Sequence, residues 1–338
     1  MRRPLARTLT AFTAAAMLLP LAGCGSGEPA GLVIYSGRNE NLVQPLIEKL
    51  EKHLGTNVEV RYGDSAELSA QLLEEGDETE AGLFLSQDAG ALGALSKDQR
   101  LAPLPKTTLD KVAPAHRSSA GDWTGVSGRV RVLAYSPGDV PTPPNSVHEL
   151  VEPAWKGKIG FVPTNASFQA FVTGMRVLEG DDATRTWLKG LKANDPKSYE
   201  NNLKVLEAVD KGEVSLGLIN HYYWYEQAAE KGADKLKAKV HYLPKGDPGG
   251  LVNVAGVGIL KGADDKQAAY AQKAVDYLLS QESQKYFAEE TKEYPLAAGV
   301  TSAEGVPPLE TLQPPKIDLG ELDSLKETLA MLQDVGLV

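Results

Sequence analysis

The densest group of residues that can do chemistry lies at positions 218–226, in the sequence LINHYYWYE. It holds three of the chain's 12 tyrosines, directly after an apolar run that predicts a strand. Neighbouring side chains point to opposite faces of a continuous strand, so Tyr222 and Tyr223 can meet one ligand only from a turn or the first turn of a helix. We therefore expect Asn220 to cap a helix that continues from 226 to 232.

Two adjacent phenols at such a corner suit a hard, highly charged cation. A free tyrosine has a pKa of about 10, but a bound trivalent ion is the largest local charge and can hold the phenolate at neutral pH. The alternative is an aromatic corner that only packs against its own lobe. The tyrosine pair predicts a metal site and leaves that structural role open.

Small polar residues that can bind an anion open two predicted helices. The segment TNASF at 164–168 follows a predicted strand. Its backbone N–H groups and the side chains of Asn165 and Ser167 can bind an anion or merely cap the helix. Asn201 and Asn202 open another helix and leave the same two alternatives.

Arg129 and Arg131 stand two apart on a segment that is predicted to be extended. Residues at this spacing share one face of a strand. One of the two guanidinium groups can therefore pair with a bound oxyanion. Solvation of both side chains at the surface is the alternative.

The elements that must position these residues alternate between strand and helix. Apolar patterning predicts strands at 32–35, 58–60 and 83–85, with helices at 42–54 and 68–73 between them. This βαβαβ order implies a parallel sheet, which binds ligands at the carboxyl ends of its strands. The loops carrying RNE at 38–40 and SQD at 86–88 are therefore candidates, although capping alone explains Asn39 and Asp88.

A second α/β set begins near residue 158, and a chain of 338 residues is long enough to divide into two lobes. The extended segments at 126–135 and 252–260 lie before and after this set. The chain therefore crosses between the lobes twice, near Arg129 and Val252, which makes a hinge. We assign the first lobe to 31–128 and 252–303, the second lobe to 129–251, and a helical segment packed on the second lobe to 304–338.

The N-terminal segment 1–23 reads as an export signal, with Arg2, Arg3 and Arg7 before an apolar stretch. It ends in LAGC, which resembles a bacterial lipobox whose Cys24 is acylated and followed by a linker at 24–30. The alternative is an ordinary cleaved signal with a chance cysteine. Loss of the three arginines changes the formal charge from −10 to about −13, which disfavours nucleic acid and anionic membrane faces as partners.

Several enzyme signatures are absent from the sequence. It contains no GxxxxGK[ST], HExxH or GxSxG motif and no complete GxGxxG. The single cysteine excludes an internal disulfide and a CxxC metal site. We expect a binding protein that is not an enzyme, with an exported hydrolase as the remoter alternative.

In these residues the chain resembles the ferric-ion-binding proteins of bacterial iron ABC importers, which close two lobes over Fe(III). The likeness covers most of the mature chain, and its most specific part is the Asn-x-Tyr-Tyr-Trp element. The matching segments, in order, are VIYSG at 33–37, LFLS at 83–86, VSGRVRV at 126–132, WKGKIGFVPT at 155–164, LINHYYW at 218–224 and GDPG at 246–249. The resemblance implies an α/β fold like that of periplasmic binding proteins of type II, with the ligand in the cleft between the lobes.

The resemblance also implies roles for individual residues. Tyr222 and Tyr223 would be the phenolate ligands of the iron. A synergistic anion such as phosphate or carbonate would complete the coordination. Its surroundings would be Asn165, Ala166, Ser167, Asn202, Asn220 and an arginine of the pair Arg129 and Arg131.

The first lobe departs from the family pattern. Some relatives have a histidine at the position of Asn39 and a glutamate at that of Gln87, and others have a tyrosine at that of Glu40. We expect Glu40 to replace the missing ligands, because a carboxylate oxygen suits a hard cation. The anion or water can fill the open positions instead.

These features predict a lipid-anchored receptor on the outer face of the cell membrane or in the periplasm. It would bind Fe(III) as a monomer and deliver it to an ABC transporter permease. The alternative of the same fold is a receptor for an organic or oxyanion solute.

Overall fold

The computed structural model describes residues 30–338 of the chain. The predicted signal at 1–23 and the lipidation site Cys24 lie outside the described residues. Among residues 30–338, no helix is both long and apolar enough to span a membrane.

The first lobe contains the predicted parallel strands. The sheet order β2-β1-β3 places β1 (Leu32–Ser36) between β2 (Val58–Tyr62) and β3 (Leu83–Ser86), and both pairings are parallel. Strand β9 (Val252–Ile259) then pairs antiparallel with β3. The helices of this lobe are α1 (Glu40–Leu54), α2 (Ser65–Glu75), α3 (Ala89–Lys97), α4 (Lys106–Leu109), α9 (Asp265–Leu278) and α10 (Gln281–Glu289).

The second lobe is built on β7 (Leu216–Asn220), which pairs parallel with β5 (Ile159–Phe161). Strand β6 (Lys197–Ser198) extends this sheet beyond β5, and β8 (Lys239–His241) pairs with β4 (Trp123–Tyr135). The helices are α5 (Ala166–Glu179), α6 (Asp181–Ala193), α7 (Asn202–Lys211) and α8 (Tyr222–Lys231).

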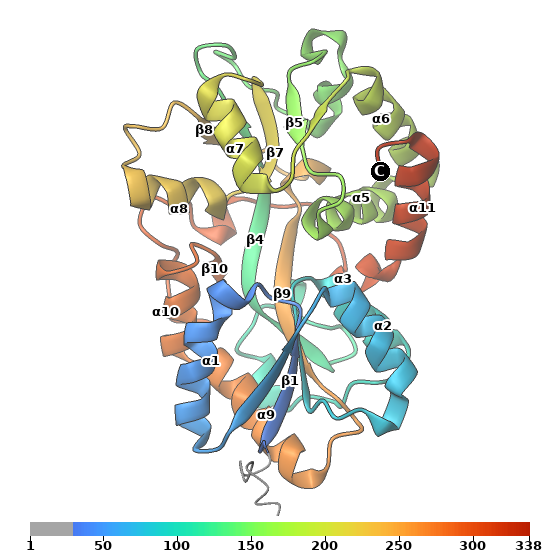
Figure 1. Ribbon diagram of the computed structural model, residues 1–338, viewed down its shortest axis with the longest axis vertical. Coiled ribbons are helices and arrows are strands. Elements are labelled where there is room, and N and C mark those ends of the chain that lie inside the picture. Colours follow the sequence, from blue (N-terminus) through green and yellow to red (C-terminus); the bar gives the residue numbers. More distant parts are fainter. Residues whose placement is uncertain (1–29) are drawn as a thin grey trace, which may run out of the picture.

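Strand β4 joins the two lobes. Its residues up to Val130 pair with β9, and those from Arg131 pair with β7. The short β10 (Tyr294–Pro295) pairs with the first-lobe part of β4. Figure 1 shows β4 and β9 running side by side between the lobes, so the chain crosses the junction twice. This double crossing places Arg129 and Arg131 at the junction.

Each lobe has its own hydrophobic core. One core packs the apolar face of α1 and α3 against β1 and β3, with Phe84 and Trp123 fully buried. The core of the second lobe contains an aromatic row in which Phe161, Phe168 and Phe171 follow one another at centroid distances of 5.3 and 5.8 Å. Separate cores allow the lobes to move as units about the junction.

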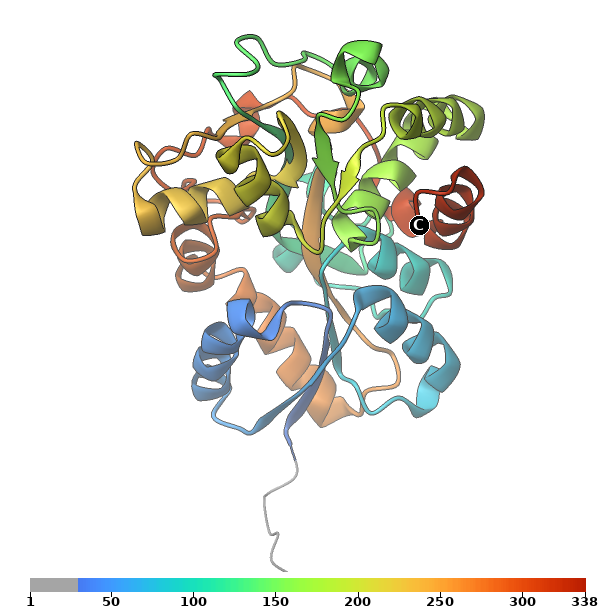
Figure 2. The same cartoon turned by 45° about the horizontal axis from the view of Figure 1, so that its top comes forward.

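The C-terminal segment contacts both lobes. The 3-10 helix η7 (Leu319–Asp323) packs on α3 of the first lobe, and Leu319 and Leu322 belong to that lobe's core. Helix α11 (Leu325–Val335) packs on α5 and α6 of the second lobe, which is where we expected the whole segment. Figures 1 and 2 both place the segment at the side of the molecule, next to the junction.

Short 3-10 helices occupy several connections. They are η1 (Gly76–Glu78), η2 (Pro114–His116), η3 (Val147–Val151), η4 (Pro153–Trp155), η5 (Pro248–Gly250) and η6 (Leu309–Thr311). In the predicted helical segment at 304–338, the structure divides the helical part of 319–335 at Ser324 into η7 and α11.

Candidate functional site

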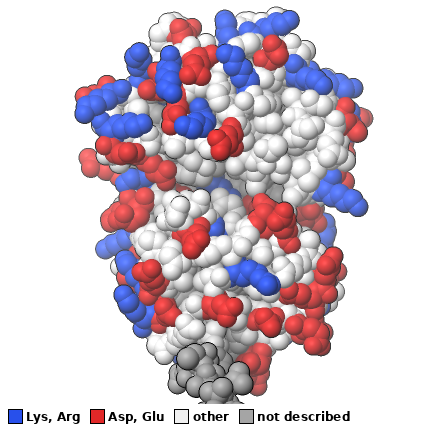
Figure 3. Space-filling model, in the orientation of Figure 1, with Lys and Arg blue, Asp and Glu red and all other residues white. Residues whose placement is uncertain are grey.

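A cleft of about 730 Å³ lies between the two lobes. Figure 3 shows the molecule hollowed across its middle, where the lobes meet. The first lobe contributes the loop after β1 and the ends of β2 and β3, whereas the second contributes Asn165 and the first turns of α8. The polar and aromatic residues of the lining are Arg38, Asn39, Glu40, Asn41, Tyr62, Asp64, Gln87, Asn165, Tyr222, Tyr223 and Glu226.

Tyr222 and Tyr223 both line the cleft from the start of α8, as the sequence predicted for a shared ligand. Their ring centroids lie 4.3 Å apart, with the planes inclined at 32°. Tyr222 is 4% exposed and Tyr223 is half-buried. Burial raises the pKa of Tyr222 well above its usual value, and the neighbouring Tyr223 adds to the shift. Tyr222 therefore offers a phenol that a strongly charged cation must deprotonate in order to bind, and Tyr223 lies beside it.

The prediction that Asn220 caps α8 is wrong. Asn220 is the last residue of β7, where it pairs with Arg131 of β4, so its backbone is still extended. The residue before α8 is His221, whose side chain makes no capping hydrogen bond. The strand therefore continues one residue further than the capping interpretation requires.

His221 supports Tyr222 from the protein interior. It is fully buried, and its Nδ1 accepts a hydrogen bond of 3.3 Å from the backbone N–H of Val130. Its ring stacks on Tyr294 at 4.6 Å and meets the Tyr222 ring edge-on at 5.9 Å. Burial lowers the pKa of His221 to about 4, so the imidazole is neutral at physiological pH.

A small cavity of about 10 Å³, the size of one water molecule, lies at the junction. Arg129 and Arg131 both line it, which confirms that they share a face. It also receives Ser167 and Asn220 of the second lobe, together with Phe171, Leu251 and Asn253.

Both arginines are buried with unpaired donors. They are 2% and 3% exposed, which excludes the alternative of solvated surface side chains. Among the described residues, no partner exists for any guanidinium nitrogen of Arg131 or for Nε and Nη1 of Arg129, whose Nη2 donates to the backbone oxygen of Gln87. Burial lowers the pKa of Arg131 to about 9. Because buried polar groups are normally hydrogen-bonded, these donors can bind a water molecule or an anion.

The rings of two phenylalanines offset part of the energetic cost of burying the charge of Arg131. The guanidinium carbon of Arg131 lies 5.6 Å from the ring centre of Phe168 and 5.4 Å from that of Phe171. Such cation–π contacts stabilise a buried cation but leave its N–H donors free.

The start of α5 contains a helix cap, and its residues face three different cavities. Asn165 accepts hydrogen bonds from the backbone N–H and the hydroxyl of Ser167, at 3.0 and 2.5 Å. Asn165 faces the cleft and Ser167 the small cavity, whereas Ala166 lines a separate apolar cavity.

The asparagines that open α7 differ from each other. Asn201 is the helix cap, because its side chain accepts from the backbone N–H of Lys204 at 3.0 Å. Asn202 is 1% exposed, and neither of its side-chain polar atoms has a partner in the described part of the chain. It lines neither the cleft nor the small cavity.

In the first lobe, Gln87 is held by a buried ion pair that sequence reasoning missed. Arg38 donates to the side-chain oxygen of Gln87 at 2.9 Å and to both carboxylate oxygens of Glu293 at 2.9 and 3.1 Å. Ser127 also donates to Glu293, at 2.7 Å. Burial alone raises the pKa of Glu293, but Arg38 and then Arg129 outweigh it and hold the pKa below its usual value.

The other first-lobe candidates lie at the rim of the cleft. Asn39 and Glu40 are both exposed, and Asn39 caps α1 by accepting from the N–H of Asn41 at 3.0 Å. Tyr62, which was not predicted, ends β2 and donates to Gln44 at 2.7 Å. Burial, followed by the charge of Glu40, raises the pKa of Tyr62 to about 12.

The chemistry on offer in the cleft comes from phenols and isolated carboxylates. Across residues 30–338, no group of three or more His, Cys, Asp or Glu side chains is arranged to hold a metal ion. A metal bound here would depend on the adjacent tyrosines.

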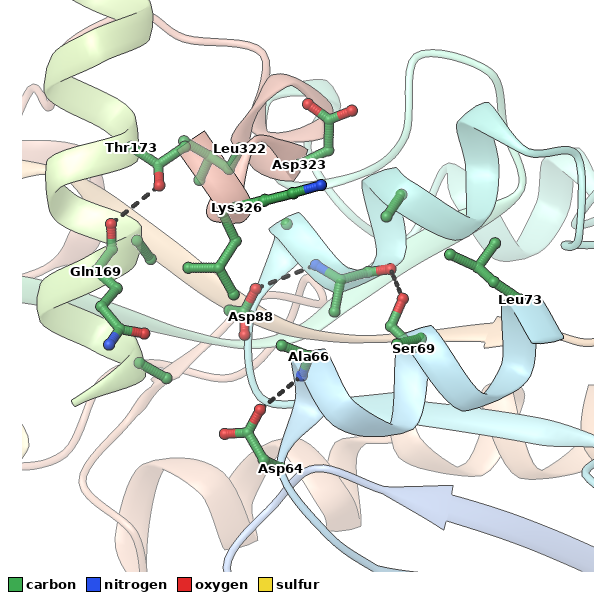
Figure 4. Close-up of a pocket in the computed structure, with 17 residues that line it drawn as sticks. Asp64, Ala66, Ser69, Leu73, Asp88, Gln169, Thr173, Leu322, Asp323 and Lys326 are labelled. Atoms are coloured by element: carbon green, nitrogen blue, oxygen red, sulfur yellow. Dashed lines mark hydrogen bonds between the residues drawn. The ribbon is translucent and has the colours of Figure 1, made fainter. Parts of the chain in front are cut away.

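An apolar cavity of about 370 Å³ lies beside the cleft. As Figure 4 shows, it is enclosed by α2 and α3 of the first lobe, α5 of the second, and the C-terminal segment. Its wall consists mainly of alanine and leucine side chains, and Asp64 is common to this cavity and the cleft. Such a lining does not suit a hard cation, which binds oxygen ligands.

Comparisons with known proteins agree with this architecture. The family model of the bacterial extracellular solute-binding proteins matches residues 79–318. The Fe(3+)-binding periplasmic protein of Serratia marcescens is 33% identical over 331 residues, which are 97% of each chain. The major ferric iron-binding protein of Neisseria meningitidis is 31% identical over 91% of this chain and 93% of its own.

A solved structure extends the likeness to three dimensions. Iron-bound HitA from Pseudomonas aeruginosa is similar with a TM-score of 0.83 and 35% identity, over 90% of this chain and 99% of HitA. The predicted two-lobed binding-protein fold is thereby confirmed. The chain therefore belongs to the family of bacterial extracellular solute-binding proteins, and its relatives in that family are ferric-ion-binding proteins.

Proposed function

We propose that this protein is an exported receptor that binds Fe(III) between its lobes and delivers it to the permease of an ABC importer. The observation that carries the proposal is the pair Tyr222 and Tyr223, whose rings lie 4.3 Å apart on the wall of a cleft shared by both lobes. Ferric iron is named as the ligand of the relatives from Serratia and Neisseria, which supports the same cargo here.

The two phenols must lose their protons on binding. Burial favours the neutral form of Tyr222 in the empty protein, whereas a trivalent cation stabilises the phenolate. Each bound iron would therefore release protons, and the apparent affinity would rise with pH.

A synergistic anion, phosphate or carbonate, would complete the coordination at the side of the cleft next to the small cavity. Its donors would be the unpaired guanidinium nitrogens of Arg131 and Arg129, together with Ser167 and Asn220. Asn165 would form the outer part of this site, whereas Asn202 and Ala166, which the sequence also suggested, line neither the cleft nor the small cavity. First-lobe oxygen would come from Glu40, as the sequence suggested.

Iron would be enclosed by movement of the lobes. We assign one moving body to 31–128 with 252–303 and the other to 129–251, joined by β4 and β9. Ligands from both sides of the cleft favour the closed arrangement, because a ligand shifts a two-state equilibrium by its differential affinity for the two states.

The N-terminal sequence LAGC supports acylation of Cys24, so that a lipid would tether the receptor to the outer face of the cell membrane. The receptor would act as a monomer without a catalytic step. Labelling of the expressed chain with a radioactive fatty acid, with Cys24→Ala as control, tests the anchor separately from iron binding.

The iron assignment is tested by titrating metal-free protein with ferric citrate. A tyrosinate-to-iron charge-transfer band should appear as a red-orange colour and saturate near one iron per chain. Tyr222→Phe with Tyr223→Phe should abolish it. Tyr225→Phe is the matched control, because Tyr225 lies on the same helix outside the cleft lining and its hydroxyl contacts Tyr242. The assignment fails if no band forms or if the double variant keeps it.

The unpaired arginines favour a second candidate, a receptor for an oxyanion solute without iron. Calorimetry separates the two candidates, because an oxyanion receptor would bind phosphate equally well with and without iron. The iron receptor would instead show phosphate and Fe(III) strengthening each other's binding by the same factor.

A further inference from the structure

Glu226 lies on α8 beside the two tyrosines of the cleft. It follows Tyr223 by three residues and Tyr222 by four on α8, so the three side chains lie on one face of the helix. All three line the same cleft. Glu226 is half-buried, and it forms neither a hydrogen bond nor an ion pair with any residue in the described range 30–338.

The first lobe offers few anionic donors close to the tyrosines. Two phenolates neutralise two of the three charges of Fe(III). In the first lobe, Gln87 is a neutral amide whose oxygen accepts a hydrogen bond from Arg38, and Glu40 is exposed at the rim. Carboxylate oxygens are preferred ligands of hard cations.

We propose that Glu226 is a carboxylate ligand of the iron, so that the second lobe alone supplies three anionic oxygen donors. This inference rests on the proposed function, because it names a further ligand of the same metal.

The surroundings of Glu226 are consistent with a carboxyl group that lacks its counter-ion in the empty protein. Burial raises its pKa to about 7, and the nearby Glu293 adds to the shift. Lys292 and Arg38 of the first lobe act in the opposite direction without forming an ion pair with Glu226. A trivalent cation beside Tyr222 and Tyr223 would supply the missing positive charge.

Ligands that come from one helix determine the order in which iron binds and the lobes close. Three donors on the first two turns of one helix form a binding face that does not depend on closure of the lobes. Iron would bind first to the second lobe in the open protein, and the first lobe would then close over it.

The test compares Glu226→Gln with Glu230→Gln, an exposed residue one turn further along α8. Both are titrated with ferric citrate, and the affinity and the position of the tyrosinate band are measured. Glu226→Gln should keep the colour and weaken iron binding about 10- to 100-fold. It should also move the band to longer wavelength, because an iron with fewer anionic donors accepts charge from the tyrosinates more readily. Glu230→Gln should match the wild type.

The outcomes separate this assignment from the proposed function. A wild-type protein without the band overturns both. If the wild type shows the band and Glu226→Gln leaves it at the same wavelength, Glu226 is not a ligand of the iron. The proposed function is not affected by that result. Weaker binding with an unmoved band also overturns ligation by Glu226, because that result places Glu226 in closure of the lobes. Circular dichroism of each variant shows that it is folded.

Discussion

Arg38 donates a hydrogen bond of 2.9 Å from Nη1 to the side-chain oxygen of Gln87. The same guanidinium forms a buried ion pair with Glu293, so its orientation is fixed from both sides. Gln87 therefore presents a neutral amide to the cleft. The side-chain oxygen of Gln87 is thus engaged by Arg38.

Replacement of this amide by a carboxylate should strengthen iron binding. Gln87→Glu places an anionic oxygen in the cleft beside Arg38, which is already present to balance its charge. We expect the affinity for Fe(III) to rise at least about tenfold, or about 1.4 kcal/mol. Competition with citrate measures the change. Gln87→Met, which matches the length without the charge, serves as control, and an equal gain in both variants would contradict the electrostatic explanation.

Removal of the buried charge of Arg131 should affect stability and binding in opposite directions. Arg131→Met removes a guanidinium group whose nitrogens have no partner among the described residues, and a buried unpaired polar group costs about 1–3 kcal/mol. We expect the variant without iron to melt a few degrees higher than the wild type in phosphate-free buffer. It should bind iron more weakly and no longer respond to phosphate.

The matched control for this variant is Arg176→Met. Arg176 donates to Asp181, Ser324 and Thr328, so its loss removes satisfied hydrogen bonds and should lower the melting temperature. Phosphate should still stabilise it as it stabilises the wild type, because a ligand stabilises the state that binds it. Equal phosphate responses in Arg131→Met and the wild type would remove Arg131 from the anion site.

The ion pair of Glu293 predicts a dependence of stability on acid. The folded pKa of Glu293 lies below its usual value, so its contribution to stability is present above the unfolded pKa of about 4.3 and is lost as the pH falls through the folded pKa. Glu293→Gln should lower the free energy of unfolding by about 3–5 kcal/mol at pH 7.

Urea unfolding at several pH values measures this difference. The gap between wild type and Glu293→Gln should narrow as the pH falls below about 4, whereas the exposed Glu289→Gln should show no comparable gap. A gap that stays constant down to pH 3 would show that Glu293 stabilises the first lobe by a route other than its charge.

Local sequence patterns were enough to predict much of the fold and the residues at the centre of the site. The strands at 32–36 and 83–86 and the helices between them follow from apolar periodicity, and the two crossings follow from long extended segments. Tyr222 with Tyr223, and Arg129 with Arg131, were predictable because each pair is adjacent or two apart in the sequence. At that spacing, the period of a helix or strand decides what faces the same way.

Other parts of the site depend on contacts that no local pattern reveals. Arg38 and Glu293 are 255 residues apart and meet only after both crossings have been made. Tyr62 reaches the cleft because β2 ends beside the loop after β1. Glu226 could have been recognised from its spacing to the tyrosines, whereas Asn220 misled because an asparagine before a helix resembles a cap.

The central claim is that the phenolate oxygens of Tyr222 and Tyr223 bind the same Fe(III) ion. Anomalous diffraction from iron-loaded crystals, recorded on both sides of the iron absorption edge, tests it most directly. We predict a single strong anomalous peak in the cleft, within bonding distance of both hydroxyl oxygens. A peak elsewhere, or one that reaches neither tyrosine, would contradict the account.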